Sequence, residues 1–470
     1  METRIMMNRF LKGFGGLFIF MFAVTSAGFA DDAQVMTMVK DLEKKMNDMQ
    51  KTIDWQNQKL KTLEQSKGSY VPAAPEGGAA AEGYSTKNFE TDLKEKLGDY
   101  GWINGMKFGG DLRLRYEGRM ERPSSTSNDQ NRFRYRLRYG FTKTFNEEMK
   151  LGFRMVSAPG ESASLTRNST NATFDNQFAF KDIAIDTAYA TYTPTWANYG
   201  PVKGVAVTAG KFENPIGGSF MVWDGDIMPE GIYETAAFKA ISTDHLNTDV
   251  TFLASQFVVE EGSGSENDDA ELFAWQVGLD SKITGVTDDP VSVKNTLTWY
   301  DWSDLAEPGN FGGVAGGNFT AAGTGGTRLA TAFNVLQLYN EIGFKVDPVP
   351  ATKLWFEWLT NTAENADDSL GGGQDNAWGI GIKLGKAKDP KTWEVGYGYY
   401  WLEANSTPGV FTDSDFGGTD RRGSVLSAKY AFTKYLQLVA AAFWTNRITA
   451  ETLTADEARN LYQLDLIWKF

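Results

Sequence analysis

Hydrophobic and polar residues alternate with a period of two along most of the chain. The C-terminal segment 462–470 is the clearest case, with apolar side chains at every second position: Tyr462, Leu464, Leu466, Trp468 and Phe470. Successive side chains of a β-strand point to opposite faces, so this period predicts a strand with one apolar and one mainly polar face. The same alternation recurs from residue 102 to the end, in about sixteen segments of roughly a dozen residues.

The connections between these segments alternate in length. Long polar connections follow the odd-numbered segments, at 118–131, 159–180, 212–232, 303–327 and 405–419. Shorter ones follow the even-numbered segments, such as 146–148 and 347–350. This regularity is typical of an all-β transmembrane protein, an antiparallel β-barrel with long outer loops and short periplasmic turns. A soluble β-sandwich is the alternative, but it has no reason to alternate loop lengths. We therefore predict a barrel of about 16 strands over residues 102–470, with apolar faces toward lipid and polar faces toward the lumen.

The first hundred residues follow other patterns. Residues 1–30 combine basic residues, a short apolar run and small residues at the end, which predicts a secretory signal peptide. Residues 31–66 carry apolar side chains at heptad spacing, which predicts a periplasmic coiled coil; a single amphipathic helix is the alternative. Residues 67–101 start rich in Gly, Ala and Pro and then form a second helical pattern, so we expect a flexible linker and a short helix.

Composition excludes several kinds of chemistry. The chain has no cysteine and one histidine, His245, among 470 residues, so disulfides, thiolate sites and His-pair metal sites are excluded. We expect no enzyme, no cofactor and no resident metal. The net charge of −14 argues against nucleic acid as a partner. The acidic stretches 266–269, 364–368 and 413–415 offer oxygen ligands for calcium, but none matches a complete loop motif.

Arginines stand on the polar face of the first three predicted strands. Four of them alternate with apolar residues between 132 and 138, and we predict that the whole set lines the pore: Arg113, Arg115, Arg132, Arg134, Arg136, Arg138 and Arg154. A guanidinium facing lipid near the midplane would cost a few kcal/mol. Two interpretations stay open, which can hold together. The arginines attract anions or orient polar solutes, or they pair with Asp111, Glu117, Glu357 and Glu394 and stiffen the wall.

The long connection 212–232 contains acidic residues and turn residues. If it folds into the lumen, Asp224, Asp226 and Glu230 would face the arginines across a constriction. The alternative is an external loop in which Asp, Gly and Pro serve only as turn residues.

Four stretches together resemble the "putative porin" family of Gram-negative bacteria. These are 110–117 (GDLRLRYE), the arginine-rich segment 132–138, 210–215 (GKFENP), and 222–226 (VWDGD) followed by 229–231 (PEG). The resemblance implies a sixteen-stranded outer-membrane diffusion channel and no particular substrate. The closing strand with Trp468 and Phe470 also resembles the signal read by the outer-membrane assembly machinery.

The sequence thus predicts a porin in the outer membrane, surrounded by its lipid, which passes small hydrophilic solutes or ions. The N-terminal coiled coil resembles that of trimeric porins, so a homotrimer is expected, and peptidoglycan is a further partner that this arrangement allows. A structural anchor, tethering the membrane to the cell wall through the coiled coil, is the alternative. Substrate, ion preference, pore radius and oligomeric state are left open.

Overall fold

The computed structural model describes the chain from residue 105 to 470. Excepted are 123–128, 159–167, 179, 262–268, 288, 309, 311–314, 324–325, 364–373 and 450–456. The predicted signal peptide, coiled coil and linker lie outside the described residues.

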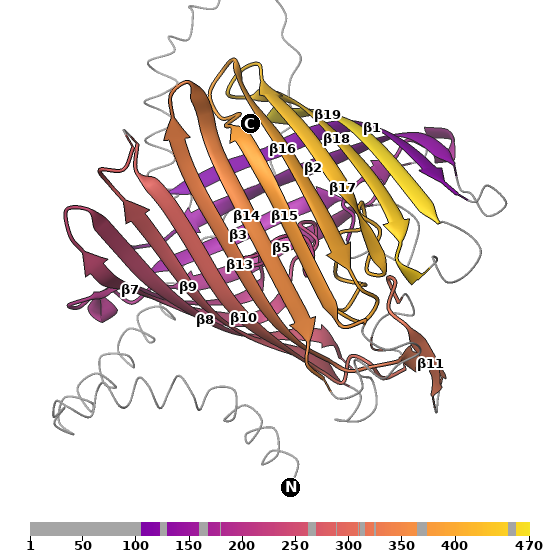
Figure 1. The fold of residues 1–470 in the computed structure, drawn as a ribbon, viewed down its shortest axis with the longest axis horizontal. Helices are drawn as coiled ribbons and strands as arrows, with labels where there is room; N and C mark the ends of the chain where they lie inside the picture. The colour runs from indigo at the N-terminus through magenta and orange to yellow at the C-terminus, as the bar shows by residue number, and fades with distance from the viewer. Residues whose placement is uncertain are drawn as a thin grey trace, which may run out of the picture. The chain divides into compact units, whose positions relative to one another are not determined.

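Sixteen strands within the described residues form one closed antiparallel barrel (Figure 1). They are β1 (Met106–Glu121), β2 (Gln130–Thr144), β3 (Met149–Ser157), β5 (Ile183–Tyr192), β6 (Val202–Lys211), β7 (Glu230–Ser242), β8 (Leu246–Glu260), β9 (Ala270–Ile283), β10 (Val291–Ser303), β13 (Phe333–Val346), β14 (Val349–Asn361), β15 (Asn376–Gly385), β16 (Thr392–Leu402), β17 (Arg421–Ala431), β18 (Leu436–Arg447) and β19 (Ala458–Lys469).

Short elements lie in the connections between the strands of the barrel. β4 (Ala172–Thr173) pairs with β2, and β11 (Thr320–Gly323) pairs with β12 (Gly326–Leu329). The 3-10 helix η3 (Asn176–Phe178) lies in the long connection between β3 and β5, whereas η4 (Thr195–Ala197) lies in the shorter connection between β5 and β6. No helix in the described part of the chain is long and apolar enough to cross a membrane.

The barrel closes between its first and last strands. β1 and β19 run antiparallel in a register that extends from Asp111 opposite Lys469 to Glu121 opposite Arg459. The backbones of Gly110 and Phe470 exchange two hydrogen bonds, of 3.0 and 3.2 Å. A Cβ atom at Gly110 would lie 2.0 Å from the carbonyl oxygen of Arg138, so only glycine fits at this point of the ring. Closure pairs the strand edges that an open sheet would leave exposed.

The two faces of the closing strand differ as its alternation predicts. Tyr462 and Leu464 are exposed on the outside, whereas Gln463 and Asp465 are buried within the barrel. The other strands carry a similar outer apolar face, with exposed members that include Leu114, Phe133, Leu297, Ile380 and Leu426. The barrel therefore presents an apolar belt of the kind that lipid requires.

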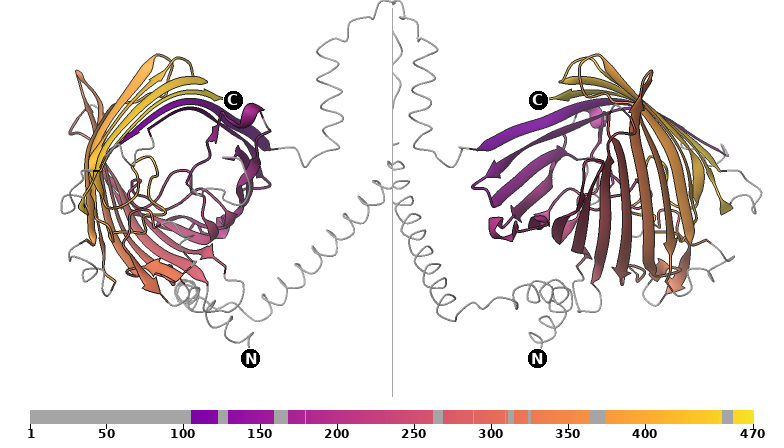
Figure 2. Two further views of the ribbon diagram at one scale, coloured as in Figure 1. Left: turned by 90° about the vertical axis from the view of Figure 1, so that its right-hand side faces the viewer. Right: turned by 60° about the vertical axis from the view of Figure 1, so that its left-hand side comes forward.

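The inner face is not uniformly polar, which corrects the prediction from the sequence. Near the long loops, the inner side chains of β8, β9, β10, β13 and β14 are apolar and buried: Phe257, Leu272, Trp302, Phe333 and Leu359. They pack against residues of three connections, 212–229, 304–332 and 403–420, in one hydrophobic core. Looking along the barrel, segments of these loops are visible inside the ring of strands (Figure 2). Loops that enter the lumen thus give the wall an apolar inner partner.

Neighbouring positions on opposite faces of β17 allow a test of the barrel's orientation toward lipid. Leu426 is exposed at the middle of this strand, and Ser427 faces inward. We expect Leu426→Lys to lower the free energy of unfolding in lipid vesicles by about 2–4 kcal/mol, because it places a charge in hydrocarbon. Ser427→Lys, the matched control, should cost much less. Denaturant titration followed by circular dichroism measures both, and equal losses would contradict the assignment of faces.

Candidate constriction site

The seven predicted arginines come together on one wall of the barrel, from β1, β2 and β3. We call them the arginine cluster. The register of β1 and β2 places Arg113 opposite Arg136 and Arg115 opposite Arg134. Like charges directly opposite each other destabilise a strand pair. The cluster therefore needs carboxylates close by, and both the wall and the loops provide them.

Four carboxylates of the wall bind the cluster. Glu117 of β1 accepts from Arg132 at 2.6 Å and from Arg134 at 3.3 Å. Asp465 of β19 holds Arg115 through two hydrogen bonds of 2.7 and 2.8 Å. The two remaining wall carboxylates are Asp111, 2.6 Å from Arg136, and Asp186 of β5, in contact with Arg138 and Arg154.

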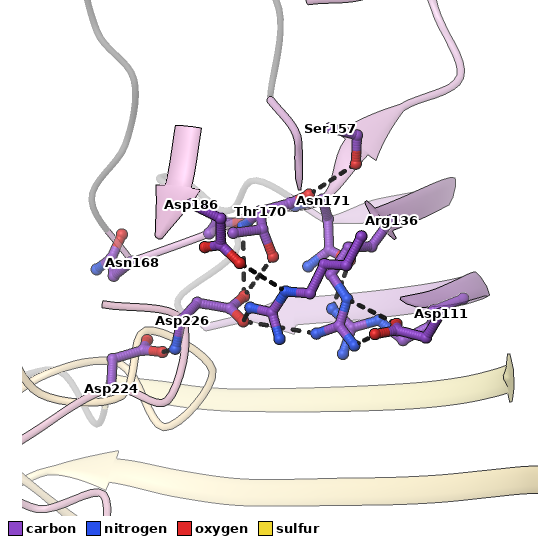
Figure 3. Close-up of polar contacts among 12 residues, drawn as sticks. Asp111, Arg136, Ser157, Asn168, Thr170, Asn171, Asp186, Asp224 and Asp226 are labelled. Carbon is purple, nitrogen blue, oxygen red and sulfur yellow. Dashed lines mark hydrogen bonds and ion pairs between the residues drawn. The ribbon is translucent and has the colours of Figure 1, made fainter. Parts of the chain in front are cut away.

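Three further carboxylates reach the cluster from loops. Asp226 lies 3.0 Å from Arg138 and 3.6 Å from Arg136, and it accepts two hydrogen bonds from Thr170. Figure 3 shows Asp226 among Arg136, Thr170 and Asp186. Glu213 contacts Arg154 at 2.5 Å, and Asp415 contacts Arg115 at 3.5 Å. The arginine cluster thus fixes loops 212–229 and 403–420 to the wall.

Seven guanidiniums and seven carboxylates make the cluster balanced in formal charge. Each arginine has a carboxylate of this set within 4.0 Å. The side chains of Arg132 and Arg154 are 25% and 22% exposed, and the other five are 13% exposed or less. These contacts agree with the interpretation that the arginines pair with carboxylates of the wall. Of the four partners predicted for them, Asp111 and Glu117 are confirmed, and Glu357 and Glu394 were wrong. Glu357 binds loop 212–229, and Glu394 contacts Lys383 and Lys429.

The three acidic residues singled out on the long connection lie in different surroundings. Of these, Asp226 contacts the arginine cluster. Asp224 instead contacts loop 403–420, and Glu230 begins β7, where it pairs with Lys211 at 2.7 Å. Glu213, at the other end of the loop, was missed because a single acidic residue beside a strand end carries no signal. Asp186, within β5, was missed because it is a single acidic residue, and Asp415 was considered only as part of the acidic stretch 413–415.

The opposite side of loop 212–229 is anchored to the far wall. The backbone N–H of Ser219 donates to both carboxylate oxygens of Glu357, at 3.2 and 3.0 Å. Gly217 exchanges hydrogen bonds with the Gln276 side chain, at 3.2 and 3.0 Å. Glu357 is fully buried. Loop 212–229 therefore spans the lumen, from the arginine cluster to β9 and β14.

A second loop supports the first. The N–H of Asp224 donates to the carbonyl oxygen of Phe411 at 2.7 Å, and the N–H of Asp413 donates to that of Phe220 at 3.2 Å. The Asp224 carboxyl accepts from the N–H of Ser414 at 3.1 Å. Burial raises the pKa of Asp224 to about 7, although hydrogen bonds from Asp226 and Ser414 oppose the shift. Burial and the nearby Asp415 and Asp224 also raise the pKa of Asp413 well above its ordinary value.

The two C-terminal residues predicted as an assembly signal lie at the end of the closing strand. Trp468 pairs with Leu112 in the β1–β19 register. Phe470 is exposed, and its ring lies 6.4 Å from that of Tyr139. Their role in assembly stays a prediction.

Comparison with known proteins identifies the family. The sequence profile of the family described as "Putative porin" matches residues 121–311 and 323–470, which is more than half of the chain. None of the curated proteins compared with the chain matches its sequence.

Solved structures with a similar arrangement are distant in sequence. OmpT of Vibrio cholerae, an outer membrane protein, in a mutant lacking loop L8, is 13% identical with a TM-score of 0.41, over 78% of this chain and 99% of that one. OprB of Pseudomonas putida is 10% identical with a TM-score of 0.45, over 82% and 97%. A triple mutant of the Rhodopseudomonas blastica porin is 10% identical with a TM-score of 0.38, over 78% and 100%.

The chain belongs to the putative porin family. Its closed sixteen-strand antiparallel barrel is the architecture expected of an outer-membrane porin channel.

The contact between loops 212–229 and 403–420 should depend on pH. The pKa of Asp224 is raised from about 4 to about 7 when the two loops are in contact. The protonated form of this carboxyl therefore stabilises the contact. Pairing is thus strongest below about pH 4 and weakens as the pH rises toward 7, by up to tenfold per pH unit. Hydrogen exchange of segments 220–226 and 409–416, corrected for intrinsic rates, should show falling protection across this range.

The variant Asp224→Asn provides the control for this titration. It keeps an oxygen acceptor for the N–H of Ser414 and removes the Asp224 charge, so its protection should change less with pH. Asp413→Asn should act in the same direction. Protection that is independent of pH in the unmodified protein would contradict the assigned shift.

Proposed function

We propose that this porin is a passive diffusion channel of the outer membrane for small hydrophilic solutes or ions, and that loop 212–229 forms its constriction. The observation that carries the proposal is the position of this loop. It is held at the arginine cluster by Asp226 and at the far wall by Ser219 and Gly217. A loop tied on both sides of a sixteen-strand ring narrows the aqueous interior that such a ring encloses.

The arginine cluster would act on solutes through the local balance of its positive and negative charges. Because seven carboxylates lie beside seven guanidiniums, the wall offers adjacent positive and negative groups and little net charge. Such a surface orients polar solutes and gives weak preference between anions and cations. Charges on external loops are screened within about 8–10 Å in physiological salt, so the sign of selectivity should depend on the cluster.

The cellular setting belongs to the same proposal. We place the barrel in outer-membrane lipid as a homotrimer, with residues 31–66 in the periplasm and with Trp468 and Phe470 read by the assembly machinery. Peptidoglycan is a partner for the N-terminal segment. We expect no enzymatic activity and no cofactor.

Single-channel recording in planar bilayers tests both the channel and the role of its charges. The unmodified protein should give discrete conductance steps. Asp226→Asn leaves Arg136 and Arg138 short of one carboxylate, so the anion-to-cation permeability ratio should rise roughly twofold. One uncompensated charge about 8 Å from a passing ion is worth about 0.5 kcal/mol in water. Physiological salt screens this to about 0.2 kcal/mol, which favours the anion and disfavours the cation by that amount each. Reversal potential across a salt gradient measures the ratio.

Paired variants make the charge test specific. Replacing Arg134 and Arg136 by Ala should move the reversal potential in the opposite direction, toward cations. Asp289→Asn, in the turn before β10, removes one carboxylate far from the cluster and should leave the potential unchanged. If all three variants keep the reversal potential of the unmodified protein, the cluster has only a structural role. Absence of conductance steps in the unmodified protein would refute the channel itself.

Deleting residues 31–66 separates the channel from the structural anchor. A diffusion channel should keep its conductance without this segment. An anchor would lose its attachment to the envelope while forming no steps in either form.

A further inference from the structure

A cavity lies on the wall that faces the arginine cluster across the barrel. It has a volume of about 280 Å³ and is lined by β13 to β17 and by Ser219 and Phe220 of loop 212–229. Its lining includes Trp355 and Tyr400 on neighbouring parts of the inner wall. Trp355 takes no part in the charged contacts that hold loop 212–229 to the arginine cluster.

Trp355 lies flat against the wall because the residues beneath it are glycines. The register places Trp355 of β14 next to Gly381 of β15, which pairs with Gly398 of β16. A Cβ atom at Gly381 would stand 2.4 Å from the indole, and one at Gly398 would stand 3.0 Å from it. Any larger residue at either position would push the ring into the lumen. The glycines therefore hold the indole as a flat surface along the wall.

Aromatic neighbours fix this surface in place. The Tyr400 ring lies 5.2 Å from the indole at an interplanar angle of 30°. Tyr400 is itself buried beneath Phe220, whose ring lies 4.4 Å away. Trp355 is only partly buried, so one part of its ring remains available to the cavity. A rigid aromatic side chain of this kind loses little conformational entropy when a ligand stacks on it.

Hydrogen-bonding groups of both kinds surround the indole. Glu341 accepts from the Lys353 ammonium at 2.6 Å and from the Tyr339 hydroxyl at 3.0 Å. Lys383, also in the lining, lies 3.7 Å from Glu394. Lys353 is exposed and Lys383 is half-buried, and their side chains are 51% and 45% exposed, so their remaining N–H donors face water. Donors and acceptors thus stand side by side, with nearly compensated charge.

These features together match one class of solute. A flat apolar surface bordered by paired donors and acceptors suits a ring with an apolar C–H face and a belt of hydroxyl groups. A purely apolar solute would desolvate the Glu341–Lys353 pair without replacing its water. An anion would find both lysines of the lining already paired, Lys353 with Glu341 and Lys383 with Glu394. We infer that the surface formed by Trp355 over Gly381 and Gly398 is a binding subsite for neutral pyranose sugars.

This inference rests on the proposed channel function and names a class of solute for it. The cavity volume is sufficient for one sugar ring with its hydroxyl groups, so the subsite would hold one ring at a time during diffusion.

Current block by maltose in planar bilayers tests the subsite. With the full chain, added maltose should reduce the open-channel current in a saturable way. Trp355→Ala should raise the half-saturating concentration about tenfold, because the stacking surface is lost. Trp355→Phe keeps a smaller ring and should fall between the two. Trp275→Ala, on the outer face of β9, is the matched control and should block as the unmodified protein does.

Each outcome of the test bears on a different claim. Conductance steps without saturable block by maltose would overturn the subsite and leave the channel standing, whereas absence of steps would refute the channel. Block that also occurs with a poly(ethylene glycol) of similar mass, unchanged in Trp355→Ala, would show volume exclusion and overturn the subsite. Block by benzoate but not by maltose, lost in Trp355→Ala, would assign the surface to aromatic anions instead.

Discussion

Seven guanidiniums can lie within this barrel only because seven carboxylates lie beside them. Removing a single partner from a buried pair leaves an uncompensated charge, which is far more costly than the pair itself is stabilising. Two pairs of arginines are directly opposite in the β1–β2 register, and Asp111, Glu117 and Asp465 compensate their charges there. Compensation by Asp226, Glu213 and Asp415 then determines where two loops must lie.

The interior is divided between two kinds of interaction. Charged pairs hold the loops to β1, β2 and β3. Aromatic and aliphatic packing, together with hydrogen bonds to Glu357 and Gln276, holds them to β8 through β16. Trp223 shows the second kind, since its ring stacks on Trp302 at 6.0 Å and on Phe411 at 5.8 Å. Loop 212–229 joins both halves. Such an arrangement keeps a long connection in one place inside a ring that is too wide for wall side chains alone to fill.

Glycines determine where a cavity remains beside the loops. Gly381 and Gly398 let the Trp355 indole lie along the wall, so this region keeps a cavity instead of a packed core. Gly110 has a different task, since it allows the close backbone approach at which β1 meets β2 and the chain terminus. In both places a glycine is required because a Cβ atom would collide with a neighbouring group.

The alternation of apolar and polar residues, together with the lengths of the connections, was sufficient to predict the barrel, its approximate strand number and the inward-facing arginines of its first three strands. These follow from the period of two, which acts within each strand and needs no knowledge of its neighbours. Only the tertiary structure determined that Asp226 contacts the cluster while Asp224 and Glu230 do not. It also placed apolar residues such as Trp302 and Phe333 inside the barrel. The reason is that a loop's partners depend on contacts between residues far apart in sequence, and local periodicity carries no information about those contacts.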